Sequence, residues 1–146
     1  MKKFKDAFKL HELVCPHVLR KYREEQSWSF MDPRALETLY VIRFDILNVP
    51  LTLNTSDGRY TQRGLRCNCC QLVKDQSAKN NPYLSSHVLG KGFDFDAKGM
   101  TAEQARQKII AESDKLPYNI RLEKGVSWVH FDLGNCSADK IQLFNG

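Results

Sequence analysis

The sequence lacks any long apolar run. No stretch approaches the roughly 18 consecutive apolar residues that a membrane-spanning helix needs, so we expect no membrane partner. The N-terminus is basic, as in a signal peptide, but Asp6, Lys9 and Glu12 interrupt any apolar segment and no small-residue cleavage site follows. We therefore expect no export signal. Internal repeats and low-complexity tracts are also absent.

The sequence also lacks the even, spaced set of cysteines typical of a secreted disulfide scaffold. Its five cysteines are Cys15, Cys67, Cys69, Cys70 and Cys136, and three of them fall within the tetrapeptide CNCC. Reduced thiols are therefore expected. A zinc site made of CNCC and Cys136 would require the fold to bring them together. We expect loop or buried thiols instead, with a redox or metal site as the alternative.

The charge has no strong excess at any one place. Lysine and arginine number 22 against 17 aspartate and glutamate residues, which gives a net charge of +5. This balance favours polyanions, which include nucleic acid and the anionic bacterial cell wall, or simply keeps the surface soluble. The basic residues are scattered, and no helix-turn-helix or aromatic RNA-binding signature is present. Nucleic acid is therefore not the expected partner.

The length of 146 residues suits one domain, and hydrophobic and charged contents of 42% and 27% are ordinary for a globular protein. Asp32-Pro33 is typical of a helix start, and Thr101 with Gln104 forms a capping-box pattern. The predicted order is a helical arm over 1–31, a helix over 33–47, a strand over 51–54, a long connection over 55–84, a strand over 92–96, a helix over 101–115, and strands over 119–122 and 126–133 around a turn at 123–125.

This order predicts an α+β fold. We expect residues 1–31 to form the arm and residues 32–146 to form one globular unit. Its sheet should be small and mainly antiparallel, with helices packed on one face and a zinc site on the other.

Two of the predicted strands carry polar groups on one face. Side chains alternate along a strand, so Asp94 and Asp96 share a face in GFDFD, with phenylalanines on the other. In VSWVHFDL, Trp128, His130 and Asp132 likewise share a face. If the strands are neighbours in one sheet, Asp94 and His130 converge.

His87 precedes the segment Gly90-Lys91-Gly92, which can fold it back over the same face. Two imidazoles and a carboxylate are ligands that zinc accepts, and a catalytic site leaves a fourth position open. Non-haem iron uses the same ligand types, but usually with the first histidine and the carboxylate two residues apart, against seven here. From spacing alone, His87 as a hydrogen-bonded loop residue, a solvated Asp94 and a partly buried His130 remain alternatives.

The segment SSHVLGKGFD resembles the SxHxxGxAxD motif of the zinc D-alanyl-D-alanine carboxypeptidase family, which includes phage endolysin peptidases. Ser85, His87, Gly90 and Asp94 match the motif, and Gly92 replaces its alanine. Downstream, WVHFD over 128–132 is similar to the family's closing W/F-V-H-V-D strand. Upstream, RGLRCN over 63–68 is similar to its S-G-Y-R-S segment.

The resemblance implies zinc on His87, Asp94 and His130. It implies that Arg66 faces a substrate carboxylate or the developing oxyanion, since a guanidinium is a fixed, permanently charged fork for a carboxylate. Arg63 and Trp128 are expected to bind substrate beside it. Ser85 is expected to support the loop or His87 by hydrogen bonding.

The general base of the family has no direct match. Some branches place Glu or Asp three residues before the last ligand and others place His two before, where this chain has Ser127 and Trp128. The remaining catalytic candidates are Asp132, on the face of His130, and Glu123, in the preceding turn. Asp132 is the favoured base, and a carboxylate that only orients a ligand is its alternative role.

The implied function is a zinc-dependent peptidase that cleaves peptidoglycan stem peptides next to a D-amino acid, as phage or prophage lysins do. Such a protein would stay in the cytoplasm until it is released to the cell wall, or would be carried on a virion with phage proteins as partners. The absence of a matching base motivates an alternative, a catalytically degenerate structural or cell-wall-binding protein of the same fold.

Overall fold

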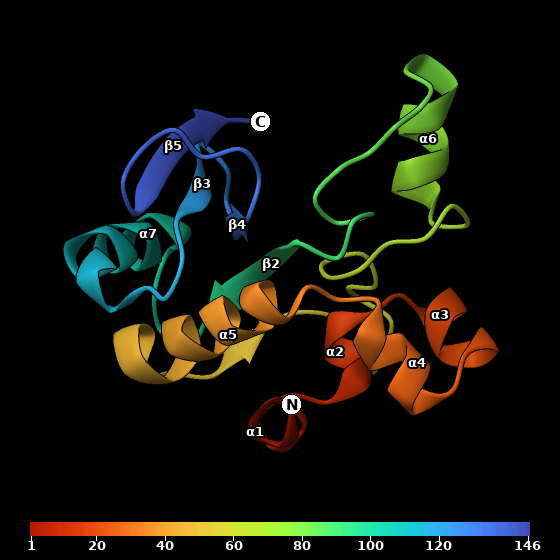
Figure 1. Ribbon diagram of the computed structural model, residues 1–146, viewed down its shortest axis with the longest axis horizontal. Coiled ribbons are helices and arrows are strands. Elements are labelled where there is room, and N and C mark those ends of the chain that lie inside the picture. Colours follow the sequence, from red (N-terminus) through yellow and green to blue (C-terminus); the bar gives the residue numbers. More distant parts are fainter.

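The computed structural model of the protein describes residues 1–146 (Figure 1). None of its helices has the length and apolar character needed to cross a bilayer. In chain order its elements are α1 (Lys2–Ala7), α2 (Leu10–Leu13), α3 (Pro16–Lys21), α4 (Glu24–Ser29), α5 (Pro33–Val41), the π-helix η1 (Ile42–Leu47), β1 (Leu51–Thr52), α6 (Gln71–Lys79), β2 (Gly92–Ala97), α7 (Ala102–Ala111), the 3-10 helix η2 (Ser113–Lys115), β3 (Ile120–Lys124), β4 (Val129–Asp132) and β5 (Ile141–Asn145).

The strands form one five-stranded sheet in the order β1-β2-β4-β3-β5. Neighbouring strands are antiparallel except β3 and β5, which are parallel. The predicted α+β class, with a small and mainly antiparallel sheet, is confirmed.

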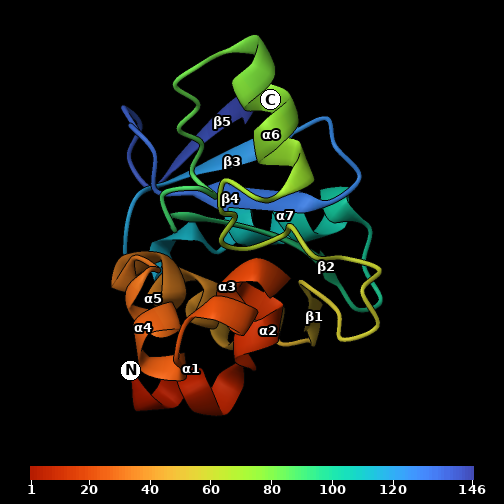
Figure 2. The ribbon, with the colours of Figure 1, turned by 90° about the vertical axis from the view of Figure 1, so that its right-hand side faces the viewer.

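The two faces of the sheet differ in chemistry. Phe93, Phe95, Val129, Phe131 and Leu122 are fully buried on one face. This face packs against α7, which in turn contacts η1 at the end of α5. Figures 1 and 2 show α5 and α7 on one side of β2 and β4, with α6 on the other. The helices therefore cover the apolar face and leave the polar face for a site.

Both predicted helix starts are confirmed. The carboxylate of Asp32 accepts a hydrogen bond from the backbone N–H of Arg34 at 2.9 Å, and the hydroxyl of Thr101 accepts one from Gln104 at 3.1 Å. Helix α5 continues as η1 to Leu47. The next residue, Asn48, adopts a left-handed conformation with φ of 53° and ends the helix.

The N-terminal segment forms four short helices; in Figure 1, α1 lies below α5, and α2, α3 and α4 lie to the right of α5. Phe8, Leu13, Val14 and Trp28 are buried and belong to the same apolar core as the sheet. The backbone of this segment also contacts the later chain, because Leu65 donates its N–H to the Leu13 carbonyl oxygen at 2.8 Å.

Several elements differ from the prediction. Strand β1 covers Leu51–Thr52 rather than 51–54, and β4 covers Val129–Asp132 rather than 126–133, so that Trp128 lies just before the strand. Helix α6 lies within the connection predicted to be irregular; Val73 is its only buried residue, so it has almost no apolar periodicity to reveal it. Strand β5 was not predicted, because Ile141–Asn145 is an edge strand with no buried residue. Glu123 and Lys124 belong to β3 rather than to the turn, and the connection to β4 covers residues 125–128.

We expect Leu122→Ala to lower the free energy of unfolding by about 2–5 kcal/mol, because Leu122 is fully buried in the apolar core. Leu84→Ala is the matched control, since Leu84 is 66% exposed and its truncation should change stability by less than about 0.5 kcal/mol. Urea unfolding followed by circular dichroism measures both. Equal losses would contradict the assignment of this face as the core.

Candidate metal centre

Pairing of β2 with β4 brings the first two predicted ligands together. Asp94 lies directly opposite His130 in the antiparallel register, and both side chains point to the polar face of the sheet. The Nδ1 atom of His130 lies 2.6 Å from Oδ1 of Asp94. The convergence that strand alternation predicted is therefore present.

His87 reaches the same place from the loop before β2. A turn that Ser85 supports holds it there: the Ser85 hydroxyl accepts from the backbone of Val88 at 3.3 Å and its carbonyl from Leu89 at 3.1 Å. His87 Nδ1 donates a hydrogen bond to the carbonyl oxygen of Gly64 at 2.9 Å. This bond orients the ring so that Nε2 faces Asp94, 3.2 Å from its Oδ2.

Ligand atoms of His87, Asp94 and His130 all lie within 4.8 Å of one another. The three residues are only 5%, 7% and 6% exposed. Two imidazole nitrogens and a carboxylate oxygen form a donor set that suits divalent transition metals. The buried His87, Asp94 and His130 triad can thus bind a metal ion.

Asp132 lies behind His130 rather than beside the ligand atoms. Its Oδ2 is 2.9 Å from Nε2 of His130, and it accepts two hydrogen bonds from Arg121, at 2.7 and 2.8 Å, and one from the backbone of Gly134 at 2.8 Å. A carboxylate with these partners holds an imidazole in one orientation, with Nδ1 toward the metal position. Arg121 was not identified from the sequence, although it alternates with the buried Ile120 and Leu122.

Glu123 follows Arg121 on the same face of β3. Arg121 pairs with Asp132 and Leu122 with Phe131 on β4, and Glu123 pairs with Phe144 on β5. Its side chain is partly exposed, unlike that of Asp132, which is 1% exposed. The two candidates for the general base, Glu123 and Asp132, therefore differ in the solvent exposure of their carboxylates.

Arg66 and Arg63, predicted to face the substrate, contact the aspartates of β2. Arg66 donates from Nη2 to Oδ2 of Asp94 at 3.1 Å and from Nε to the carbonyl of Gln62 at 2.5 Å. Arg63 donates to Asp96 at 2.8 Å and stacks its guanidinium over the ring of Tyr60 at 3.6 Å. Asp96, whose side chain is 43% exposed, thus forms an ion pair with Arg63.

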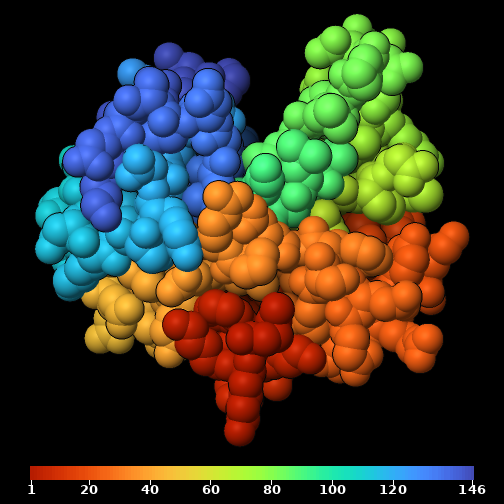
Figure 3. Space-filling model, in the orientation of Figure 1, coloured from red at the N-terminus to blue at the C-terminus, as the bar shows by residue number.

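A surface pocket reaches Asp94 of the triad. Its lining includes Arg59, Arg63, Arg66, Asp94 and Trp128, with a volume of about 270 Å³. The space-filling view shows the surface hollowed between the C-terminal strands and the segment around α6 (Figure 3). The sequence-predicted substrate residues thus share one pocket with a candidate metal ligand.

Buried charge sets the protonation of the site. Burial opposes ionisation of Asp94, but hydrogen bonds from His130 and His87 outweigh it and hold the pKa of Asp94 well below its usual range. Burial would also lower the pKa of His130, yet hydrogen bonds to Asp132 and Asp94 raise it to about 9. Burial lowers the pKa of His87, and its hydrogen bond with Asp94 offsets this effect only in part. Without a metal, a proton occupies the space between His130 and Asp94.

A second group of potential ligands lies elsewhere in the molecule. Cys15, His17, Cys67 and Cys70 each place one ligand atom within 4.8 Å of the others. The set that the sequence suggested does not form, because the thiol of Cys136 lies against the carbonyls of Ile120 and Ala138. The sequence does not identify Cys15 and His17 as partners of CNCC, although Cys-Pro-His at 15–17 is a potential signal.

No family model matches the chain, and no curated protein or solved structure is significantly similar to it.

We expect Asp132→Asn to weaken metal binding at the triad by about 10- to 100-fold, because His130 loses the carboxylate that orients it. Asp96→Asn is the matched control, since Asp96 contacts Arg63 and no ligand. Competition with a chromophoric chelator measures the affinity, and circular dichroism checks folding. Equal affinities for the two variants would contradict the orienting role.

The raised pKa of His130 predicts a pH dependence of stability in the metal-free protein. A raised pKa stabilises the folded state fully below the unfolded value of about 6.5, and this contribution is lost as the pH rises through about 9. We expect the free energy of unfolding to fall over this interval, by at most about 1.4 kcal/mol per pH unit from this one group.

His130→Gln removes the titrating group and serves as the control. Urea unfolding in EDTA at pH 6.5, 7.5 and 9 compares the two proteins, and other titrating groups cancel in the difference. If the free energy of unfolding changed with pH in the same way in both proteins, His130 would not be the group that titrates.

Proposed function

We propose that the protein is a zinc-dependent peptidase that cleaves peptidoglycan stem peptides next to a D-amino acid. The observation that carries the proposal is the His87, Asp94 and His130 triad beside an open, arginine-lined pocket. Zinc is the metal of choice because two imidazoles and one carboxylate, with one side open, are typical of its hydrolytic sites. When bound, zinc supplies a Lewis acid that polarises a carbonyl and activates water.

The substrate class follows from the pocket and from the motifs. Arg59, Arg63 and Arg66 provide positive charge for the carboxylates of a stem peptide, and Trp128, 37% exposed, provides an apolar wall. The similarity of residues 85–94 and 128–132 to the D-alanyl-D-alanine carboxypeptidase motifs adds the D-amino acid and a phage or prophage lysin-like role.

The carboxylates divide the remaining tasks. We assign Asp132 to orienting His130, because Arg121, Gly134 and His130 already occupy its oxygens. Glu123 is then the candidate general base, since it is partly exposed and shares its face of β3 with Arg121, which contacts Asp132. Arg66 holds Asp94 and has the second nitrogen of its fork to offer a substrate carboxylate or oxyanion.

The experiment is incubation of the zinc-loaded protein with purified muropeptides, read by mass spectrometry. We expect release of a D-alanine or a stem fragment, and loss of this activity in His87→Ala, which removes a ligand. Glu123→Gln should lower the rate by about 100-fold or more while zinc stays bound, as is usual for loss of a general base. Glu103→Gln, on the exposed surface of α7, is the matched control.

A second candidate function is a cell-wall-binding or structural protein with the same site but no catalysis. The observation that favours it is the presence of Ser127 and Trp128 where the similar family places its base. Zinc-loaded protein that sediments with purified cell walls but releases no fragment from muropeptides would support this function and contradict the peptidase.

A further inference from the structure

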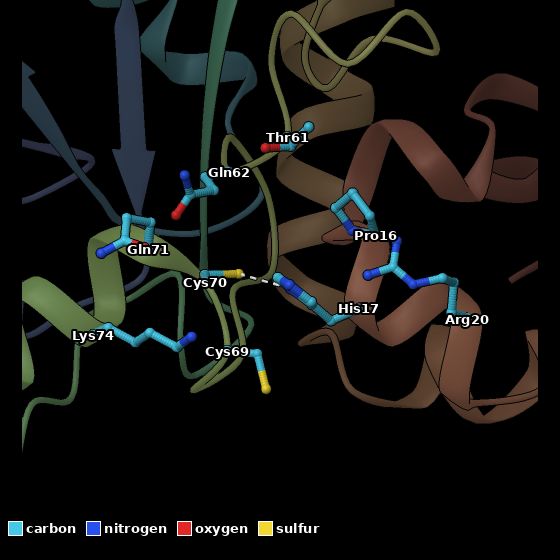
Figure 4. A pocket seen from close by; sticks show the side chains of 9 residues that line it. All are labelled: Pro16, His17, Arg20, Thr61, Gln62, Cys69, Cys70, Gln71 and Lys74. Atoms are coloured by element: carbon cyan, nitrogen blue, oxygen red, sulfur yellow. Dashed lines mark hydrogen bonds between the residues drawn. The ribbon is translucent and has the colours of Figure 1, made fainter.

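The second group of potential ligands, Cys15, His17, Cys67 and Cys70, joins two distant segments of the chain. Cys15 and His17 flank Pro16 at the start of α3, and Cys70 is the N-cap residue of α6. Figure 4 shows the imidazole of His17 and the thiol of Cys70 facing each other across this junction, with Nδ1 and Sγ 3.7 Å apart.

Backbone contacts, not the thiols, bring these segments together. Val14 and Leu65 form a parallel bridge, and Cys15 donates its N–H to the Leu65 carbonyl at 3.0 Å. The chains approach closely because residue 64 is glycine, where a Cβ would clash with the backbone of Leu13. A turn closed by the N–H of Cys70 on the carbonyl of Cys67, at 3.1 Å, then presents both thiols to the same side.

The spacing of the four donors matches a tetrahedral ion. Zinc bonds of about 2.3 Å to sulfur and 2.0–2.1 Å to nitrogen place neighbouring ligand atoms roughly 3.5–3.8 Å apart. The Cys70 to His17 distance is 3.7 Å, and every pair lies within 4.8 Å, so small side-chain shifts complete the geometry. Three thiols and one imidazole are one of the donor sets of structural zinc sites.

We propose that Cys15, His17, Cys67 and Cys70 bind a structural zinc ion that fastens the N-terminal helices to the segment before α6. Four protein ligands fill a tetrahedral shell and leave no position for substrate, in contrast to the three ligands of the triad. Cys15 and Cys70 are buried, and binding displaces the thiol protons to solvent.

Two neighbouring cysteines define the limits of the site. Cys69 is exposed, and Figure 4 shows its sulfur turned away from His17 and Cys70. Cys136 lies against the carbonyl of Ile120. All five cysteines are free thiols in the structure, and an odd group of three thiols with an imidazole suits a metal better than a disulfide.

The proposed zinc also supports the triad indirectly. The backbone of Leu65 is hydrogen-bonded to that of Cys15. Its two neighbours in the chain contact the triad: the Gly64 carbonyl accepts a hydrogen bond from His87, and Arg66 donates one to Asp94. Cys67 follows Arg66 directly. Fixing Cys15 and Cys67 on one ion therefore holds the stretch of backbone that positions two groups of the candidate metal centre.

The test uses the full chain, purified reduced and loaded with Co²⁺ or Zn²⁺. Thiolate coordination of Co²⁺ gives a near-ultraviolet charge-transfer band that a His/Asp/His site cannot give. We expect this band in the wild type and about two zinc ions per chain by elemental analysis. Cys70→Ser should lose the band and one zinc ion per chain, whereas Cys69→Ser, the matched control, should keep both.

His87→Ala separates this proposal from the proposed function, because it should lose the zinc of the triad but keep the thiolate band. Loss of a structural metal can unfold a small domain, so the wild-type spectrum decides if Cys70→Ser does not fold. A folded, reduced wild type without the band overturns the proposal. A disulfide among Cys15, Cys67 and Cys70 in protein purified without reductant, found by peptide mass spectrometry, also overturns it.

Discussion

The pairing of β2 with β4 is the constraint on which the rest of the structure depends. Because Asp94 lies opposite His130, one register both buries the phenylalanines on one face and assembles a carboxylate and an imidazole on the other. A shift by one residue would exchange the faces of a strand, placing its acids in the apolar core. The free energy of core packing thus also maintains the geometry of the candidate metal centre.

The site holds several charges out of water, and they are stable only because each is paired. Two guanidinium groups, of Arg66 and Arg121, balance the carboxylates of Asp94 and Asp132, and protonated His130 lies between the carboxylates. In the metal-free protein the proton on His130 occupies the place that suits a cation. Metal binding therefore exchanges one cation for another in a site that is already organised.

The segment over 64–70 connects the two proposed metal sites. Gly64 and Arg66 contact the triad directly, while Cys67 and Cys70 face Cys15 and His17. The N-terminal helices thus contribute to the site without reaching it, through the backbone that they hold. Along the chain, Cys15 and His17 come first, residues 64–66 that support the triad come next, and Cys67 and Cys70 follow them directly. A metal ion held by the two pairs of ligands would therefore fix the loop that supports the triad.

Local sequence determined the strand alternation in GFDFD and VHFD and the caps at Asp32 and Thr101, because these depend on near neighbours along the chain, and the order of these elements indicated the α+β class. The meeting of Asp94 with His130 needed the pairing of β2 with β4. Helix α6 and strand β5 bury little and left no periodic signal. The contacts of Asp132 with Arg121, of His87 with Gly64, and of Cys15 and His17 with the CNCC segment were decided only by the tertiary structure. They join residues with no fixed spacing in sequence, and only the packed core brings such residues within bonding distance.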